Sequence, residues 1–167
     1  MANPCRSILF VCLGNICRSP LAEGVFRAEW QRIAVAPLLD IASAGTGAWH
    51  AGAPPDPRSV EIAAANGIDI SGQRARRIDV RDFDRHDLIL GMDRTNVETL
   101  RAMAPADGRA QIHLFMEYAL GEAREVPDPY YGGAGGFADV YRMIRTASER
   151  LAERLAGSSS GHASSMT

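Results

Sequence analysis

The sequence predicts an α/β fold of the doubly wound class, with a four-stranded parallel sheet and helices on both of its faces. Short apolar runs of strand type alternate with segments of helical periodicity along the chain. A length of 167 residues suits one such domain and leaves little room for two. Parallel strands need crossover connections, so we expect right-handed βαβ units throughout.

The first predicted unit is a strand, a tight loop and a helix. The strand Ser7–Leu13 is a β-branched and aromatic run that ends before Gly14. Ser19 is the expected cap of the helix, Pro20 suits its first turn, and apolar residues recur at helical spacing to about Gln31. The loop therefore follows the carboxyl end of a parallel strand, which is where ligands bind in such sheets.

The later elements continue the alternation. Asp56 is the expected cap of a second helix that starts at Pro57 and stops at Asn66-Gly67. A third helix is expected from Asp93 or Thr95 to Met103, and apolar spacing predicts a C-terminal helix between Phe137 and Leu155. The remaining strands are expected at Leu38–Ala42, Asp87–Met92 and Gln111–Phe115.

Composition sets the expected surroundings of the protein. No stretch approaches the roughly 18 apolar residues of a membrane span, so we expect no membrane partner. A net charge of −2 argues against nucleic acid as a partner. All 18 basic residues are arginine, which excludes a lysine nucleophile. We expect one domain over residues 1–156, followed by a disordered polar tail at Gly157–Thr167.

The cysteines gather near the N-terminus, at Cys5, Cys12 and Cys17. An odd number of cysteines at one end of the chain is no disulfide framework, so a reducing, cytoplasmic location is expected. Four histidines are scattered singly, and we therefore expect no metal site and no cofactor.

The chemistry is predicted in the loop between Cys12 and Arg18. Backbone N–H groups and the positive end of a helix converge there and favour a tetrahedral oxyanion such as inorganic phosphate. Arg18 can grip two oxygens in a fork, and this environment favours a thiolate at Cys12. Gly14 permits a close backbone approach and a positive φ, and Asn15 also tolerates the left-handed region and can tie the loop with its side-chain amide. The residues between the two are Leu13, Gly14, Asn15, Ile16 and Cys17.

The segment VCLGNICRSPLAEGVFR resembles the signature of the low-molecular-weight protein tyrosine phosphatases. Further stretches match the family in order, namely SAGTGAW, APPDPRS, MDRTN and PDPYYGG. The likeness covers about Ser7 to Ala156. It implies a phosphotyrosine phosphatase I-like fold that hydrolyses protein phosphotyrosine and small aryl phosphates without metal or cofactor.

The resemblance also implies residue roles. Cys12 would be the nucleophile that forms a phosphocysteine, and Arg18 would bind the phosphoryl oxygens. Asn15 would shape the loop, and Ser19 would hydrogen-bond the Cys12 sulfur. Asp128 would be the general acid that protonates the leaving phenolate and then the base that activates water, as this chemistry requires.

Apolar residues are expected around the substrate. Trp49, Tyr130 and Tyr131, with Leu13 and Ile16, resemble walls that sandwich an aromatic ring, and the depth of such a pocket would select phosphotyrosine. The resemblance also implies that family members directed at arginine phosphate carry threonine at the position that matches Ile16. An isoleucine there therefore favours phosphotyrosine as the substrate.

Three further features receive interpretations. Cys17 resembles a backup thiol that traps an oxidised nucleophile as a disulfide, although a small hydrophobe that fills space explains it equally well. His50 is interpreted as a surface histidine. The arginines between Arg74 and Arg85 alternate with aspartates, which is typical of a solvated face.

Two alternative functions stay open. An arsenate reductase of the same fold also places a cysteine before an arginine, but it needs resolving cysteines downstream, and the chain has none after Cys17. The cysteine count leaves open a variant coupled to glutathione, mycothiol or thioredoxin, in which Asp128 has no clear task. A non-catalytic phosphate- or phosphotyrosine-binding module needs the loop and Arg18 but has no use for a nucleophile and an acid, which argues against it.

Overall fold

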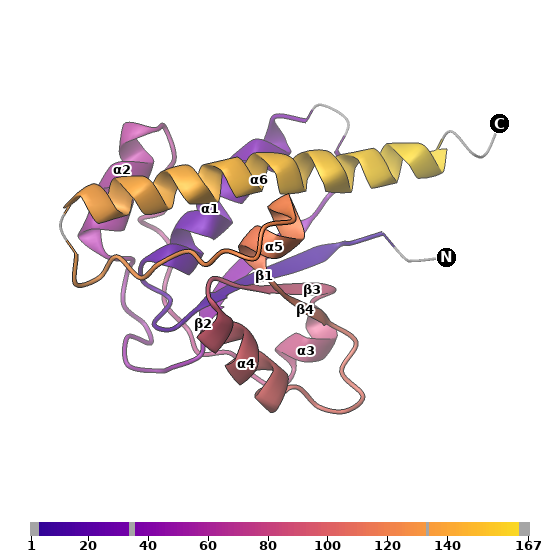
Figure 1. Cartoon of the computed structure of the whole chain (residues 1–167), viewed down its shortest axis with the longest axis horizontal. Helices are drawn as coiled ribbons and strands as arrows, with labels where there is room; N and C mark the ends of the chain where they lie inside the picture. The colour runs from indigo at the N-terminus through magenta and orange to yellow at the C-terminus, as the bar shows by residue number, and fades with distance from the viewer. Residues whose placement is uncertain (1–3, 34–35, 133, 164–167) are drawn as a thin grey trace.

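The strands of the computed structural model, which describes residues 4–33, 36–132 and 134–163, form one parallel sheet with helices on both faces (Figure 1). The strand order is β2-β1-β3-β4. The predicted fold class, a four-stranded doubly wound sheet, is therefore confirmed over the described part of the chain. The strands are β1 (Ser7–Cys12), β2 (Asp40–Gly45), β3 (Leu88–Gly91) and β4 (Gln111–Leu114).

β1 lies at the centre of the sheet and connects its two layers. All six residues of β1 are buried, as expected of a central parallel strand. Ile8 and Phe10 belong to the larger core, against the helices of one face. Leu9 and Val11 alternate with them and pack into the smaller core on the other face. Cys12, the last residue of the strand, is therefore held in place by a strand that is packed on both faces.

The helices divide unequally between the two faces (Figure 1). The long helix α6 contacts α1, α2 and α5 over one face, while α3 and α4 lie on the other. The first group comprises α1 (Arg18–Gln31), α2 (Pro57–Ala65), α5 (Phe115–Leu120) and α6 (Ala134–Ala163), and the second comprises α3 (Asp82–Arg85) and α4 (Arg94–Met103).

Two boundaries differ from the sequence-based expectation. β2 begins later and runs further than Leu38–Ala42, because it pairs in register with β1 from Ser7↔Asp40 to Cys12↔Gly45. The expected cap at Ser19 is wrong. The cap position of α1 is Cys17, whose side chain makes no capping hydrogen bond, and Ser19 lies inside the helix. Its hydroxyl is used elsewhere, as described below.

The sequence pattern missed α3 and α5 and ended the last helix too early. Both missed helices are shorter than two turns, so they carry almost no periodic signal. α6 continues to Ala163, whereas a disordered tail was expected from Gly157 onward. Extending a formed helix costs far less than starting one, so weak helix formers can follow a stable helix. Residues 164–167 of that expected tail lie outside the described residues.

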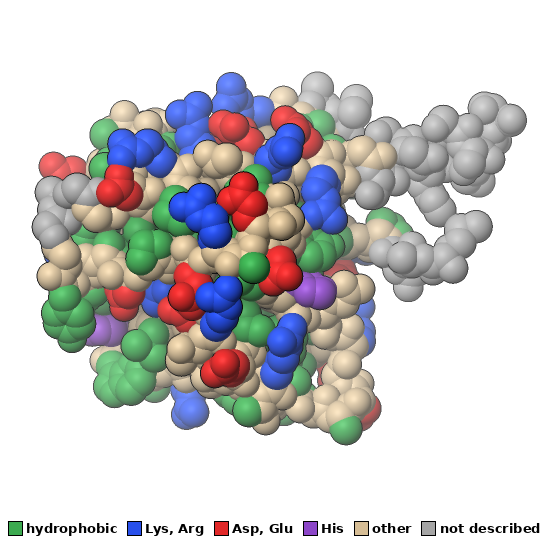
Figure 2. All heavy atoms as spheres, viewed as in Figure 1, with side chains coloured by type: hydrophobic (Ala, Val, Ile, Leu, Met, Phe, Trp, Pro, Cys, Tyr) green, Lys and Arg blue, Asp and Glu red, His purple; other side chains and the backbone are tan. Residues whose placement is uncertain are grey.

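Charged side chains of both signs lie on the face of the molecule seen in Figure 2, where arginine and acidic side chains are interspersed. None of the helices in the described ranges is both long enough and apolar enough to cross a bilayer.

Candidate active site

Asn15 fixes the loop that joins β1 to α1. It is the one non-glycine residue with a positive φ in the described part of the chain, at 58°. Its amide nitrogen donates to Ser19 Oγ at 2.8 Å and to Ser43 Oγ at 3.0 Å. Its amide oxygen accepts the backbone N–H of Arg76 at 3.0 Å. Three hydrogen bonds thus hold a strained backbone in place. Of the two loop residues that could adopt a positive φ, Asn15 does so and Gly14 does not.

The Cys12 sulfur lies beneath this loop, and the residue is 3% exposed. The backbone N–H of Asn15 donates to Sγ at 3.3 Å, and Ser19 Oγ lies 3.0 Å from it. Ser19 Oγ accepts a hydrogen bond from the Asn15 amide, and its own hydrogen has two acceptors within reach, the Cys12 sulfur at 3.0 Å and the carbonyl oxygen of Ala44 at 3.4 Å. The sulfur is the nearer of the two acceptors. Two donors aimed at one sulfur are the arrangement that a thiolate requires.

Arg18 opens α1 with its guanidinium almost fully buried. Nη1 donates to Asp93 Oδ2 at 2.7 Å and to the carbonyl oxygen of Val126 at 3.0 Å. Burial opposes the charge of Arg18, but attraction to Cys12 and the hydrogen bond to Asp93 outweigh it and raise the arginine pKa. The side chain is therefore a permanent, anchored cation. Sequence reasoning missed Asp93, although the MDRTN match contains it.

Asp128 approaches the same guanidinium from a separate segment, residues 127–132. Its Oδ2 lies 3.7 Å from Arg18 Nη2, and its Oδ1 accepts the backbone N–H of Tyr130 at 3.0 Å. The carboxyl group is 44% exposed, so it can reach water. Cys12, Arg18 and Asp128 together line one cavity of about 320 Å³.

The mouth of this cavity is apolar. Trp49 is 73% exposed and Tyr131 is 95% exposed, which is unusual for such large side chains. Ile16 lies deeper and is buried. The other predicted residues that line the cavity are Leu13, Gly14, Cys17 and Tyr130. Asn15 and Ser19 do not line the cavity. Their side chains hydrogen-bond to each other and support the Cys12–Arg18 loop.

His50 is a cavity residue that sequence reasoning missed. It lines the cavity instead of lying on open surface, and its ring centroid is 6.3 Å from that of Tyr130. A side chain at Gly14 would place its Cβ 3.0 Å from His50 Cδ2. The glycine therefore makes room for this ring. The only sequence signal was adjacency to Trp49.

Cys17 is buried in a small apolar cluster with Ile16, Ala75 and Phe137. Burial, and then repulsion from Asp56, raises the pKa of Cys17 to about 12. Cys17 is consequently a neutral thiol at ordinary pH. The redox-protective role that the resemblance implies stays a prediction.

The arginine and aspartate cluster is partly structural. Asp82 is fully buried and accepts two hydrogen bonds from the guanidinium of Arg76, each of 3.0 Å. The interpretation of a simple solvated face is therefore wrong for this pair. Arg76 connects the cluster to the active-site loop, since its backbone N–H is bound by Asn15.

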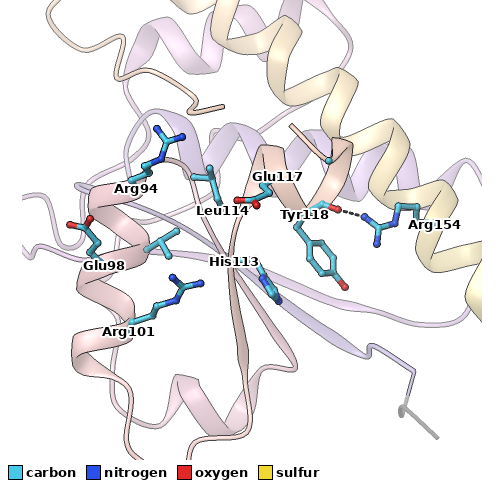
Figure 3. Close-up of a pocket in the computed structure, with 10 residues that line it drawn as sticks. Arg94, Glu98, Arg101, His113, Leu114, Glu117, Tyr118 and Arg154 are labelled. Atoms are coloured by element: carbon cyan, nitrogen blue, oxygen red, sulfur yellow. Dashed lines mark hydrogen bonds between the residues drawn. The ribbon is translucent and has the colours of Figure 1, made fainter. Parts of the chain in front are cut away.

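A larger cavity of about 620 Å³ lies elsewhere, between α4, α5 and α6 (Figure 3). Its walls carry both signs of charge, including Arg101, Glu117 and Arg154. Arg154 is committed to the backbone carbonyl of Tyr118 and lies over its ring. None of the predicted site residues lines this cavity. Within the described ranges, no three His, Cys, Asp or Glu side chains are grouped so as to hold a metal ion.

The fold and the site define a class of protein, namely parallel α/β domains with a cysteine and an arginine at the two ends of their first strand-to-helix loop. Residues 7–160 match the model of the family "Low molecular weight phosphotyrosine protein phosphatase". The chain belongs to this family.

Known proteins of the family align over nearly their whole length. The low molecular weight phosphotyrosine protein phosphatase of Schizosaccharomyces pombe is 44% identical over 89% of this chain and 96% of its own. A protein tyrosine phosphatase structure from Entamoeba histolytica, with Hepes in the active site, matches with a TM-score of 0.85 and 34% identity over 92% of this chain and 99% of that one. Vibrio vulnificus Wzb in complex with benzylphosphonate matches with a TM-score of 0.79 and 30% identity over 89% of this chain and 98% of that one.

Proposed function

We propose that the protein is a protein-tyrosine-phosphatase that hydrolyses phosphotyrosine and small aryl phosphate monoesters through a cysteinyl-phosphate. The observation that carries this proposal is the convergence of Cys12, Arg18 and Asp128 on one cavity. A nucleophile, a fixed cation and a carboxyl group are the three groups that the reaction needs. Membership of the phosphatase family supports it.

In the first step the Cys12 thiolate attacks phosphorus. A sulfur–phosphorus bond forms as the bond from phosphorus to the aryl oxygen breaks, and Asp128 gives its proton to the departing phenolate. Arg18, anchored by Asp93, holds the charged phosphoryl oxygens in its guanidinium fork.

In the second step water attacks the phosphocysteine. Asp128, now ionised, accepts a proton from the water, the sulfur–phosphorus bond breaks, and inorganic phosphate leaves. The hydrogen-bond donors around the sulfur, Ser19 and the N–H of Asn15, stabilise the thiolate as the leaving group. The proposed reaction uses neither metal nor cofactor.

The cavity supports phosphotyrosine as the substrate class. Its nucleophile lies beneath an apolar mouth that includes Trp49 and Tyr131, so an aryl group can stack while its phosphate reaches Cys12. A phosphoserine side chain is shorter and has no ring to stack. Ile16 favours phosphotyrosine over arginine phosphate. The benzylphosphonate and Hepes held by the related structures support binding of aryl phosphates and other oxyanions in the same loop.

The proposed setting is the cytoplasm, with phosphotyrosine-containing proteins as partners. Catalysis needs a reduced nucleophile, and Cys5, Cys12 and Cys17 are all free thiols. Two alternatives make different predictions. An arsenate reductase would consume arsenate and a thiol reductant, and a binding module would retain phosphotyrosine without releasing phosphate.

Hydrolysis of an aryl phosphate by the purified protein, in the presence of a chelator, tests the proposal. Cys12→Ser should abolish turnover, and Asp128→Ala should lower kcat by about 10² to 10⁴, because proton transfer by one positioned group contributes that much. Cys5→Ser, outside the site, is the matched control and should keep its activity. Turnover of Cys12→Ser near that of the unaltered protein would rule out covalent catalysis by this residue.

Phosphotyrosine, phosphoserine and phosphoarginine peptides of one sequence then establish the substrate class. We expect kcat/KM to be highest for phosphotyrosine. A higher value for phosphoarginine would reject the assignment based on Ile16.

A further inference from the structure

The N-terminal turn of α2 contacts both segments that carry the proposed chemistry. Its residues Asp56 to Ser59 form the DPRS end of the APPDPRS motif, and the proposed reaction assigns no role to this motif. On the side of the Cys12–Arg18 loop, the backbone N–H of Asp56 donates to the carbonyl oxygen of Ile16 at 2.8 Å. The hydroxyl of Ser59, which is fully buried, donates to the carbonyl oxygen of Cys17 at 3.4 Å. This turn is therefore attached to the loop beside the nucleophile.

Asp56 in turn fixes the side chain of Arg58. The carboxylate accepts Arg58 Nε at 3.0 Å on one oxygen and Nη2 at 3.0 Å on the other, which is a two-pronged pairing. It also accepts the backbone N–H of Arg58 at 2.8 Å and so caps the helix. These hydrogen bonds from Arg58 lower the pKa of Asp56, so the pair stays charged at neutral pH.

On the other side, Arg58 holds the segment that carries Asp128. Nη2 donates to the carbonyl oxygen of Tyr130 at 3.0 Å, and Nη1 donates to that of Gly132 at 3.5 Å. The guanidinium carbon lies 4.4 Å from the centroid of the Phe137 ring, at the start of α6. Four groups thus hold one guanidinium, namely the Asp56 carboxylate, the carbonyl oxygens of Tyr130 and Gly132 and the Phe137 ring.

Tyr130 completes the connection to the acid. Its backbone N–H donates to Asp128 Oδ1 at 3.0 Å, while its backbone carbonyl accepts from Arg58. One residue therefore joins the arginine to the carboxylate through its main chain. Arg58 does not line the cavity, so it acts on the reaction only through the groups that it contacts, and its two contacts with backbone carbonyls both lie in the segment that carries Asp128.

We infer that Arg58 is a positioning residue that sets the place of the Asp128 carboxyl group relative to the Cys12–Arg18 loop. The inference rests on the proposed function. Without the guanidinium, the segment 127–132 loses its hold on α2, and the acid is displaced from the leaving oxygen. Displacements of about 1 Å in a reacting group can cost about 10² in rate.

The leaving group provides a readout that a merely structural role would not produce. A phenolate with an ordinary pKa of about 10 needs a proton in order to leave, whereas a strongly acidic nitrophenol does not. Loss of the correctly placed acid therefore slows phenyl phosphate far more than 2,4-dinitrophenyl phosphate. The constant to compare is kcat/KM, since it reports the step in which the leaving group departs.

The experiment compares Arg58→Met and Arg58→Lys with the unaltered protein on both esters. We expect kcat/KM for phenyl phosphate to fall by about 10-fold or more in both variants, and kcat/KM for the dinitrophenyl ester to change less than threefold. Arg58→Lys keeps a positive charge beside Asp56, so this variant is expected to fold even if Arg58→Met does not. A single ammonium group cannot replace both the two-pronged pairing with Asp56 and the contacts with the carbonyls of Tyr130 and Gly132. Arg145→Ala removes an exposed arginine that pairs with Glu149 on α6, and it should leave both esters unaffected.

A double variant separates this inference from the proposed function. If Arg58 acts through Asp128, then Arg58→Met should add no further loss in an Asp128→Ala background. Equal losses on both esters, or additive losses in the double variant, would overturn the positioning role while Asp128 remains the acid. If Asp128→Ala itself shows no dependence on the leaving group, the proposed function fails instead.

Discussion

At the scale of single residues, Asn15 fixes the shape of the active-site loop through both its backbone and its side chain. Its side chain takes no part in the proposed reaction. Its left-handed backbone turns the loop around the sulfur and aims an N–H at it, and its side chain ties that loop to Ser19, Ser43 and the backbone of Arg76. The backbone and the side chain make separable contributions, because glycine can supply the first without the second.

Two substitutions at Asn15 separate these contributions. Asn15→Ala should lower the free energy of unfolding by roughly 3 kcal/mol, from about 1–2 kcal/mol of left-handed strain and from the lost buried hydrogen bonds. Asn15→Gly should recover the strain part of that loss, and both should reduce kcat/KM for an aryl phosphate. Urea unfolding of both variants measures the difference. Equal stability of the alanine and glycine variants would show that the backbone conformation is not strained.

The sequence singled out the residues whose type and motif suggest chemistry, and it missed those that only tertiary packing brings near them. Cys12, Arg18 and Asp128 all line the cavity, and their catalytic roles stay predictions. Asp93 and His50 reach the site from loops distant in sequence, and no local pattern marks them. Arg58 is part of the APPDPRS motif, but its proposed role depends on the contact between the start of α2 and residues 127–132. No local sequence pattern predicts that contact.

At the scale of elements, the ends of helices supply the site. α1 begins with Arg18, α2 begins at the turn that holds Arg58, and α4 begins after Asp93. Asp93 serves two elements at once. One oxygen accepts the N–H of Asn96 in a reciprocal capping box, and the other accepts from Arg18 at 2.7 Å.

Removal of the Asp93 side chain should therefore lower the free energy of unfolding by more than the loss of a helix cap alone. Asp93→Ala should lower the free energy of unfolding by about 2–4 kcal/mol, because a cap contributes about 1 kcal/mol and the buried Arg18 also loses its partner. Asp93→Asn should cost less, since its amide oxygen can still accept the Asn96 N–H. Chemical denaturation measures both, with Asp107→Asn on the exposed turn after α4 as the control. A loss in Asp93→Ala no larger than in the control would contradict the dual role.

Elements were predictable where periodicity or caps are strong. The cap at Asp56 and the alternation of strands and helices were correct. The bounds of β2 were wrong because register with β1 decides them, and register is a property of two strands together. The start of α1 was wrong because Ser19, a good capping residue by type, is engaged with the Cys12 sulfur and Asn15.

At the scale of the whole molecule, a chain of polar side chains, buried except at Arg76, connects the two ends of β1. Asn15, near the carboxyl end, accepts from the backbone of Arg76, whose guanidinium binds Asp82. Asp82 lies 3.4 Å from His86 Nε2, and His86 Nδ1 lies 2.6 Å from the hydroxyl of Ser7 at the start of the strand. Burial alone would raise the pKa of Asp82, but the nearby His86 ring and the hydrogen bonds from Arg76 and the backbone N–H of Asp79 outweigh it and lower the pKa well below its usual value.

This shift gives the fold a defined acid sensitivity. Because the pKa is lower in the folded than in the unfolded state, Asp82 stabilises the protein above about pH 4, and this stabilisation is lost as the pH falls through the folded pKa. Asp82→Asn should lower the free energy of unfolding at pH 7 by about 2–3 kcal/mol and should make it fall less between pH 7 and pH 3. Denaturation at both pH values measures this, with Asp84→Asn, exposed on the same helix, as the control. A pH dependence unchanged in Asp82→Asn would refute the coupling.

The position of Cys12 at the end of β1 has a consequence for motion. A central strand buried on both faces exchanges its amide hydrogens only when the entire domain opens, whereas a half-exposed peripheral segment can open by itself. We therefore expect the amide hydrogens of β1 beside the nucleophile to exchange more slowly than those of residues 127–132 beside the acid. Any movement that admits or releases a ligand is then expected on the Asp128 side of the cavity, while the sulfur stays in place.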